Sequence, residues 1–295
     1  MKHMKTKLEV SGYELWISNP DKPMWPEQNI TKAHYLHRLL ELSPYLLRYC
    51  SNRYMTTIRY PHGAFDKGFY QKNAPEPIPP FVKTAEWNGV RYVNVDHPAT
   101  LLWLGNLGAL EFHPSFQYIG AELPAEWILD VDPSLPNEPR LMEAVLYIGE
   151  ALQQVHIQSI PKTSGATGVQ MFIPIEHGYT FEQLRSVGKF IAQYLVERHP
   201  DLFTIERLKR NRGNRIYLDY VQHWLGKSLS APYTPRARKI ASVSTPLHWD
   251  EVEANVHPEQ FHLDNILPRL ARTGDLIEQL PKQNLSHVLS FLQGS

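Results

Sequence analysis

Several features that would narrow the function are missing from this sequence. Cys50 is the single cysteine among 295 residues, so no intramolecular disulfide can form, and the chain suits a reducing compartment. No apolar run approaches the length of a transmembrane helix. The N-terminal stretch MKHMKTKLEV lacks the apolar core of a signal peptide. We therefore expect a cytoplasmic protein that does not engage a membrane.

An excess of either charge is also absent, because 30 Lys and Arg balance 30 Asp and Glu. The whole-chain charge thus gives no sign of nucleic acid, and any such signal must come from local clusters. What the chain does have is 42% hydrophobic residues and enough length for a sizeable core, which indicates a globular protein. It shows no repeat, no low-complexity tract and no flexible linker.

Apolar residues recur at helical spacing in some segments and form short strand-like runs in others. The spacing predicts helices over residues 32–49, with Thr31 as a cap, and over 141–155 and 181–198. Strands are expected over residues 56–60, 127–132, 169–175 and 215–221. This mixture predicts an α/β or α+β fold with several strands in one sheet.

Two aspartates follow the apolar start of WILDVDPSLP, residues 127–136. Because successive strand side chains point to opposite faces, Asp130 and Asp132 project from the same face, a few ångströms apart. Unpaired carboxylates this close repel one another. The pair therefore either fans out into solvent, with Asp132 starting a turn at Pro133, or shares a cation.

A third carboxylate interrupts the apolar run RIYLDYV, residues 215–221. Burying Asp219 alone would cost several kcal/mol, so it needs a partner, which is either a nearby arginine or a metal ion. Three carboxylates offer the hard oxygen donors that Mg²⁺ and Mn²⁺ prefer, and two such ions about 4 Å apart clamp an in-line phosphoryl displacement.

Small polar residues and arginines accompany these carboxylates. KTSGATG, residues 162–168, is either a plain hairpin turn or a turn whose N–H groups and hydroxyls face an anion, and it matches neither a Walker nor a Rossmann motif. ERLKRNRGNR, residues 206–215, is a basic cluster or a solvated face. Arg236 and Arg238, two residues apart, are suited to one polyphosphate. With two metal ions, they predict a nucleotidyl-transfer site.

These residues together resemble the polymerase domain of bacterial ATP-dependent DNA ligase D, a member of the archaeo-eukaryotic primase superfamily that acts in non-homologous end joining. The matching stretches follow in order along nearly the whole chain: SNPDKPMWPE (18–27), RYPHGAFDKGFYQKNAP (59–75), LGALEFHPS (107–115), DVDPS (130–134), KTSGATG (162–168), YLDYVQ (217–222), APYTPRAR (231–238) and VSTPLHWDEV (243–252). The resemblance implies a single primase-polymerase domain over residues 1–295, with a central, mainly antiparallel sheet flanked by helices.

The resemblance also implies roles for individual residues. Asp130, Asp132 and Asp219 match the catalytic aspartates that bind two Mn²⁺ or Mg²⁺ ions. The matches to positions that contact the incoming nucleotide are His113, Ser164, Thr167, Gln170, Gln222, Arg236 and Arg238. Lys22 and Lys32 match lysines that recognise the 5′-phosphate of a DNA end, and Phe69 matches an aromatic residue that contacts template bases.

The match departs from the family at two positions of the KTSGATGVQ stretch. Thr167 and Gln170 stand where the family usually has lysine and histidine. Both side chains would face the triphosphate, so the loss of two cationic groups predicts weaker nucleotide binding or slower turnover.

The activity that the resemblance implies is template-directed addition of nucleotides, preferentially ribonucleotides, to a primer 3′-hydroxyl at gaps or overhangs that bear a 5′-phosphate. The implied partners are DNA ends with a 5′-phosphate, NTP or dNTP, a DNA ligase domain or protein, and Ku, in a nucleoid-associated setting. No KxDG-type adenylation motif is present, so ligase activity is not expected. Two alternatives stay open: a stand-alone primase of the same superfamily, and a weakly active or non-catalytic DNA-end binder.

Overall fold

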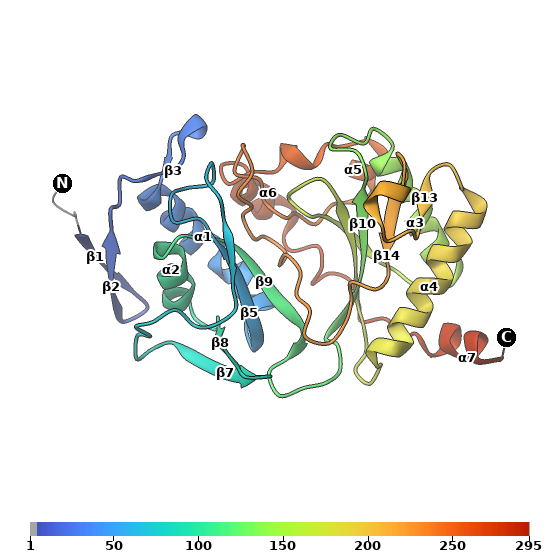
Figure 1. Cartoon of the computed structure of the whole chain (residues 1–295), viewed down its shortest axis with the longest axis horizontal. Helices are drawn as coiled ribbons and strands as arrows, with labels where there is room; N and C mark the ends of the chain where they lie inside the picture. Colours follow the sequence, from blue (N-terminus) through green and yellow to red (C-terminus); the bar gives the residue numbers. More distant parts are fainter. Residues whose placement is uncertain (1–4, 295) are drawn as a thin grey trace. The chain divides into compact units, whose positions relative to one another are not determined.

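The computed structural model describes residues 5–294, so the first four residues of the N-terminal stretch considered above lie outside it. The chain folds into two compact units, each assembled from separate segments (Figure 1). Unit 1 contains residues 5–115, 228–244 and 261–272, and unit 2 contains residues 116–227, 245–260 and 273–294. The single domain expected over residues 1–295 stays a prediction. Within residues 5–294, every helix is too short or too polar to cross a membrane.

Unit 1 combines helices with a largely antiparallel sheet. Its elements are β1 (Lys5–Val10), β2 (Tyr13–Ser18), β3 (Pro23–Trp25), η1 (Pro26–Gln28), β4 (Ile30–Thr31), α1 (Lys32–Cys50), β5 (Arg53–Arg59), β6 (Phe69–Gln71), β7 (Lys83–Trp87), β8 (Val90–Asn94), α2 (Pro98–Asn106), and most of β9 (Ala109–Tyr118) and α6 (Ile266–Thr273). The main sheet has the order β6-β5-β8-β7, and β9 also pairs with β5. Helices α1 and α2 pack closely, since a Cβ added at Gly105 would lie 2.8 Å from Leu36 and 2.9 Å from Leu39.

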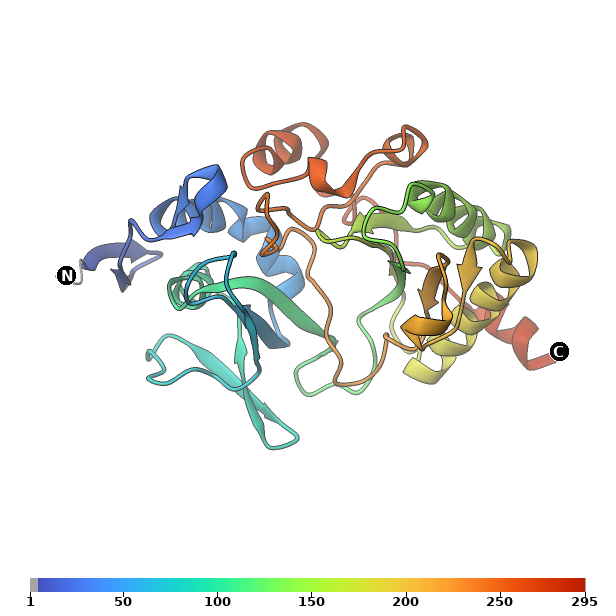
Figure 2. The same ribbon diagram turned by 45° about the horizontal axis from the view of Figure 1, so that its top comes forward.

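Unit 2 contains the second five-stranded sheet, in the order β11-β12-β10-β14-β13. Its elements are β10 (Glu126–Pro133), α3 (Leu141–Gln154), β11 (Ile160–Thr163), β12 (Val169–Pro174), α4 (Phe181–Arg198), β13 (Phe203–Thr204), η2 (Lys209–Asn211), β14 (Ile216–Asp219), α5 (Trp249–Glu253), η3 (Pro258–Gln260) and α7 (Ser286–Gly294). All neighbouring strands are antiparallel except β13 and β14. Helices α3 and α4 lie on the same side of this sheet (Figures 1 and 2).

The three expected helices are confirmed as α1, α3 and α4, within one residue at every end. Thr31 caps α1 as expected, because its hydroxyl accepts a hydrogen bond from the main-chain N–H of His34 at 3.2 Å. In α4 the cap is reciprocal: Thr180 and Gln183 each bond the other's main-chain N–H. The local signals for where these helices begin therefore agree with the fold.

The expected strands divide between the two sheets. The runs 127–132, 169–175 and 215–221 correspond to β10, β12 and β14 of one sheet, whereas residues 56–60 overlap β5 of the other. Strand β14 is shorter than expected and ends at Asp219. Its Oδ1 accepts from the N–H groups of Val221 at 3.1 Å and Gln222 at 2.9 Å, so the chain turns there instead of continuing the ladder.

Candidate active site

The three carboxylates expected to bind metal share one face of the unit 2 sheet. Trp127 is buried towards α4, where it lies near Gly188, and strand alternation places Asp130 and Asp132 on the opposite face. Asp130 is the Cα partner of Asp219 in the antiparallel pair β10 and β14. Directly opposed residues have their Cβ atoms about 4.5–5.5 Å apart on the same face.

Asp130 shows the strongest electrostatic perturbation of this group. Burial and the charges of Asp132 and Asp219 raise its pKa to about 7, although a hydrogen bond with Gln170 and the charge of Lys162 act in the other direction. The charges of Asp132 and Asp219 therefore disfavour ionisation of Asp130, and a cation placed among them would relieve that repulsion.

Arg212 and main-chain N–H groups hold the other two carboxylates. Arg212 Nη1 donates to Asp132 Oδ2 at 3.3 Å, and its guanidinium stacks over the ring of Tyr217 at 3.8 Å from the centroid. Asp219 is oriented by the N–H of Gln222. In the described part of the chain, no three His, Cys, Asp or Glu side chains are arranged so that they could already hold a metal ion.

The donor set nevertheless fits a divalent ion. Asp130, Asp132 and Asp219 all lie on one face, and carboxylate oxygens are the ligands that Mg²⁺ and Mn²⁺ prefer. Burial is the largest cause of the raised pKa of Asp130, and the negative charges of Asp132 and Asp219 add to it. These residues could hold the ions that the sequence resemblance implies.

The KTSGATG stretch forms a tight hairpin turn between β11 and β12. Ser164 Oγ accepts hydrogen bonds from the N–H groups of Ala166 and Gly168, each at 3.1 Å. These two N–H groups therefore stabilise the turn itself. Gly168 is required, since a Cβ would lie 2.5 Å from the carbonyl oxygen of Val131, between the two β10 aspartates. The turn, with half-buried Thr167, is thus pressed against the carboxylate strand.

Gln170 lies directly beside Asp130 and is almost fully buried. The two are Cα partners across β10 and β12, and their side chains are hydrogen-bonded. On its other side, Gln170 Oε1 accepts a hydrogen bond from Lys162 Nζ at 2.5 Å. The carboxamide of Gln170 therefore has a protein partner on each side, Asp130 on one and Lys162 on the other. This structural role was not expected from the sequence, which predicts a nucleotide contact for Gln170.

In unit 1, Glu111 of β9 holds two of the expected nucleotide-binding residues. Arg236 Nε donates to Glu111 Oε2 at 2.8 Å, and His113 Nε2 lies 3.1 Å from the same oxygen. The N–H of Ala237 donates to the other oxygen at 3.1 Å. Burial would raise the pKa of Glu111, but the hydrogen bond from His113 and the charge of Arg236 hold it at about 2. Glu111 stays ionised and keeps His113 and Arg236 next to one another.

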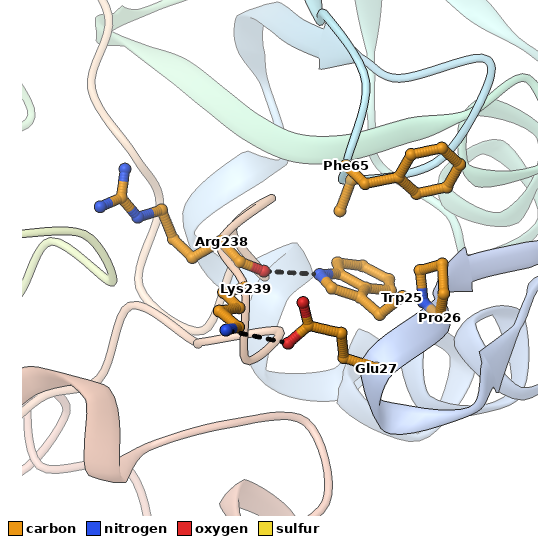
Figure 3. A pocket seen from close by; sticks show the side chains of 7 residues that line it. Trp25, Pro26, Glu27, Phe65, Arg238 and Lys239 are labelled. Atoms are coloured by element: carbon orange, nitrogen blue, oxygen red, sulfur yellow. Dashed lines mark hydrogen bonds and ion pairs between the residues drawn. The ribbon is translucent and has the colours of Figure 1, made fainter.

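Arg238 has different surroundings from Arg236. It is exposed, and it borders a hollow of about 260 Å³ lined by Trp25, Pro26, Glu27, Ala64, Phe65, Arg238 and Lys239 (Figure 3). Its carbonyl oxygen accepts from Trp25 Nε1 at 3.0 Å, while its guanidinium points away from the hollow (Figure 3). The main chain of Arg238 is therefore anchored, and its charged group extends into solvent.

Lys22 and Lys32 are neighbours, as their proposed shared role requires. The main-chain N–H of Lys32 donates to the carbonyl of Lys22 at 2.8 Å. Lys32 Nζ donates to Asn106 O at 2.9 Å and to Ser18 Oγ at 3.1 Å, and Lys22 Nζ donates to Pro61 O. Burial and the charge of Lys22 lower the pKa of Lys32 to about 8. Two cations are thus held close enough to repel one another.

Phe69 belongs to a group of exposed aromatic side chains in unit 1. It is 46% exposed and lies under the guanidinium of Arg59, 5.5 Å from the ring centroid. Phe65 and Tyr70 are 66% and 71% exposed, although sequence reasoning singled out Phe69 alone. Exposed rings of this kind offer stacking surfaces for nucleic-acid bases.

Comparison with known proteins establishes the family. The family profile described as LigD, primase-polymerase domain, matches residues 31–277. This chain belongs to that family. Among curated relatives, it is 37% identical over 265 residues to the bifunctional non-homologous end joining protein LigD of Bacillus subtilis (strain 168), covering 88% of this chain and 43% of that protein. It is 27% identical to the multifunctional non-homologous end joining protein LigD of Mycolicibacterium smegmatis, covering 90% of this chain and 36% of that protein. The chain thus spans less than half the length of these relatives.

A solved LigD structure confirms the fold. The polymerase domain from Mycobacterium tuberculosis ligase D, in complex with DNA, matches with a TM-score of 0.83 over 90% of this chain and 97% of that chain, at 24% identity. The resemblance found in the sequence is confirmed, and so is the mixed fold with a mainly antiparallel sheet and flanking helices.

Three residues of this LigD-type chain were missed by the sequence analysis. Glu111 lies two residues before His113, so alternation along a strand would have placed both on one face. Arg212 stood among five basic residues, Arg207, Lys209, Arg210, Arg212 and Arg215, and only its burial separates it from the others. Lys162 had no signal in the sequence, because its partner Gln170 is defined by strand pairing.

Proposed function

We propose that this protein is a metal-dependent nucleotidyltransferase that extends a primer 3′-hydroxyl under the direction of a template, with ribonucleotides preferred. The observation that carries the proposal is the pairing of Asp130 with Asp219 across β10 and β14, with Asp132 two residues further along, in a chain of the LigD primase-polymerase family. Two bound Mn²⁺ or Mg²⁺ ions would lower the pKa of the 3′-hydroxyl and stabilise the charge of the transferring phosphoryl group.

The chain's own groups prepare the carboxylates for this task. Gln170 orients Asp130, Arg212 restrains Asp132, and the turn after β14 orients Asp219. Residues locked by neighbouring hydrogen bonds need little rearrangement when a ligand binds, which favours both metal affinity and rate.

Nucleotide binding is assigned to a second set of residues. Ionised Glu111 orients both His113 and Arg236, and a guanidinium in a rigid setting suits phosphate oxygens. Exposed Arg238 adds a second positive charge. By resemblance, the remaining nucleotide contacts are Ser164, Thr167, Gln170 and Gln222.

DNA-end recognition is assigned to Lys22 and Lys32, with Phe69 contacting the template. Two neighbouring ammonium groups at the start of α1 suit a terminal 5′-phosphate, since a helix N-terminus also favours an anion. We further propose that the protein works beside a DNA ligase and Ku in bacterial non-homologous end joining, at the nucleoid within the cytoplasm.

Primer extension on a gapped duplex with a 5′-phosphate tests this function. The reactions compare ribonucleotides with deoxynucleotides, Mn²⁺ with Mg²⁺, and a gap that ends in a hydroxyl. We expect metal-dependent addition of ribonucleotides that Asp219→Ala abolishes, whereas Asp250→Ala, a change at an exposed aspartate of α5, leaves extension intact. Equal extension by the wild type and Asp219→Ala would refute the assignment of the carboxylates. Synthesis on an unprimed template would instead indicate a primase.

A further inference from the structure

Four polar side chains form a single row across the unit 2 sheet. Lys162 of β11 is the Cα partner of Gln170, Gln170 is the partner of Asp130, and Asp130 is the partner of Asp219. Paired residues in antiparallel strands point to the same face, and neighbouring strands are about 4.8 Å apart. The row therefore leads from an ammonium, through a carboxamide, to the carboxylates.

Lys162 is completely buried. Lysines are almost never fully buried unless they are paired, so this one requires partners. The segment after residue 244 covers it, because Pro246 forms a bridge with Lys162 and Thr163 N donates to Thr245 O at 2.9 Å. Its Nζ donates to Gln170 Oε1 at 2.5 Å and approaches Thr163 O at 3.4 Å. These contacts place the ammonium inside the protein, on the side of Gln170 away from Asp130.

The position of this ammonium determines which way the Gln170 carboxamide faces. An ammonium only donates hydrogen bonds, so the amide oxygen of Gln170 must face Lys162. The amide NH₂ then faces Asp130, with which Gln170 is hydrogen-bonded, and it can only donate to that carboxylate. Lys162 thereby determines the donor that Asp130 receives.

We propose that Lys162 is a positioning residue of the carboxylate site, an internal counter-ion that fixes Gln170 and, through it, Asp130. The inference rests on the proposed function in one respect, because it takes these carboxylates to be the metal ligands. Thr167 and Gln170 are neutral, and Lys162 of the adjacent strand β11 adds an ammonium next to Gln170. A lysine that only filled space would be replaced without loss by an apolar side chain of similar volume, since dehydrating an ammonium is unfavourable.

Melting temperatures of the metal-free protein, in EDTA at pH 8, test the counter-ion role. Lys162→Met retains the length of the side chain and removes the ammonium. We expect it to lower the Tm by about 5 °C or more, because it removes the counter-charge that acts on Asp130 and the donor that Gln170 accepts. In an Asp130→Asn background the same substitution should cost clearly less, since the group bonded to Gln170 is then neutral. Lys189→Met, at an exposed lysine of α4, is the matched control and should have the same small effect in both backgrounds.

Two further measurements separate positioning from packing. Gln170→Lys added to Lys162→Met returns an ammonium to the row and should recover most of the lost Tm, whereas Gln170→Met on the same background should not. Adding Mn²⁺ should narrow the Tm difference between the wild type and Lys162→Met, because the ion takes over as counter-charge.

Equal losses from Lys162→Met in both backgrounds, or a higher Tm for Lys162→Met, would overturn the proposal. If Mn²⁺ does not raise the Tm of the wild type, the proposed metal-dependent function fails instead. The comparison of the two backgrounds in EDTA still decides the role of Lys162 in that case.

Discussion

Replacing Asp130 by asparagine should make the metal-free protein more stable, although the proposed reaction requires this aspartate. The pKa of Asp130 rises from 3.8 to about 7, with burial as the largest cause and the charge of Asp132 next. A difference of about 3 pKa units corresponds to about 4 kcal/mol at 1.36 kcal/mol per unit. Asparagine has nearly the same shape, and its amide oxygen can still accept the hydrogen bond from Gln170.

The gain in stability should depend on pH in a defined direction. Because the folded-state pKa is raised, the folded chain retains a proton at Asp130 where the unfolded chain has lost it. The penalty for ionising Asp130 is therefore absent below about pH 4, grows up to about pH 7 and is complete above it. Near pH 4 the variant should match the wild type, and at pH 8 it should exceed it by at most about 4 kcal/mol, or roughly 10 °C in Tm.

Thermal and urea unfolding of the wild type and Asp130→Asn in EDTA, at several values between pH 4 and 8, measure this difference. The same series with Mn²⁺ should reverse the order, since only the wild type gains the full free energy of metal binding. Primer extension should be lost in the variant throughout. An asparagine variant that is less stable than the wild type at pH 8 in EDTA would show that Asp130 is not under electrostatic strain.

Four further changes have expected outcomes. The ratio of Kd values for a gap with a 5′-hydroxyl and a gap with a 5′-phosphate measures the preference for the phosphate. Because the pKa of Lys32 is about 8, this preference should be largest near pH 7 and decline as the pH rises through 8. Lys32→Ala should abolish it. Glu111→Gln removes the charge that holds Arg236 and should raise the KM for nucleotide several-fold while Lys32-dependent end binding stays unchanged. Gly168→Ala should lower the Tm, because the new Cβ would lie 2.5 Å from a β10 carbonyl oxygen; an unchanged melting curve would contradict that contact. Thr167→Lys, on the half-buried turn, should lower the nucleotide KM, and an unchanged KM would mean that this position does not face the triphosphate.

Local sequence signals predicted the secondary structure well where a single periodicity dominated. Helix α1 has apolar residues at helical spacing and Thr31 as a cap. Both signals depend only on residues three or four positions apart in the sequence. The end of β14 was not predictable in this way. Asp219 was recognised as a carboxylate that needs partners, but the partners that end the strand are main-chain N–H groups of the next residues, and an apolar run does not reveal them.

The candidate site was predictable as a list of residues, and its internal contacts were not. The i, i+2 spacing of Asp130 and Asp132 follows from strand geometry alone. Their surroundings depend on pairing between strands that are distant in sequence: Asp219 is the cross-strand partner of Asp130, and buried Arg212 bonds Asp132. The sequence allowed an arginine partner for Asp219, but the structure places the arginine on Asp132.

The interleaving of the two units has a consequence for synthesis on the ribosome. Unit 1 begins with residues 5–115 but also needs residues 228–244 and 261–272, and unit 2 ends with residues 273–294. Unit 1 has all its segments only once residue 272 has been made, and unit 2 only once residue 294 has been made, so unit 1 cannot be completed before most of unit 2 has been synthesised. A nascent chain stalled near residue 230 would carry the complete carboxylate row, yet would lack residues 245–247, which cover Lys162. The ammonium of Lys162 therefore becomes shielded from water only after residues 245–247 have been made.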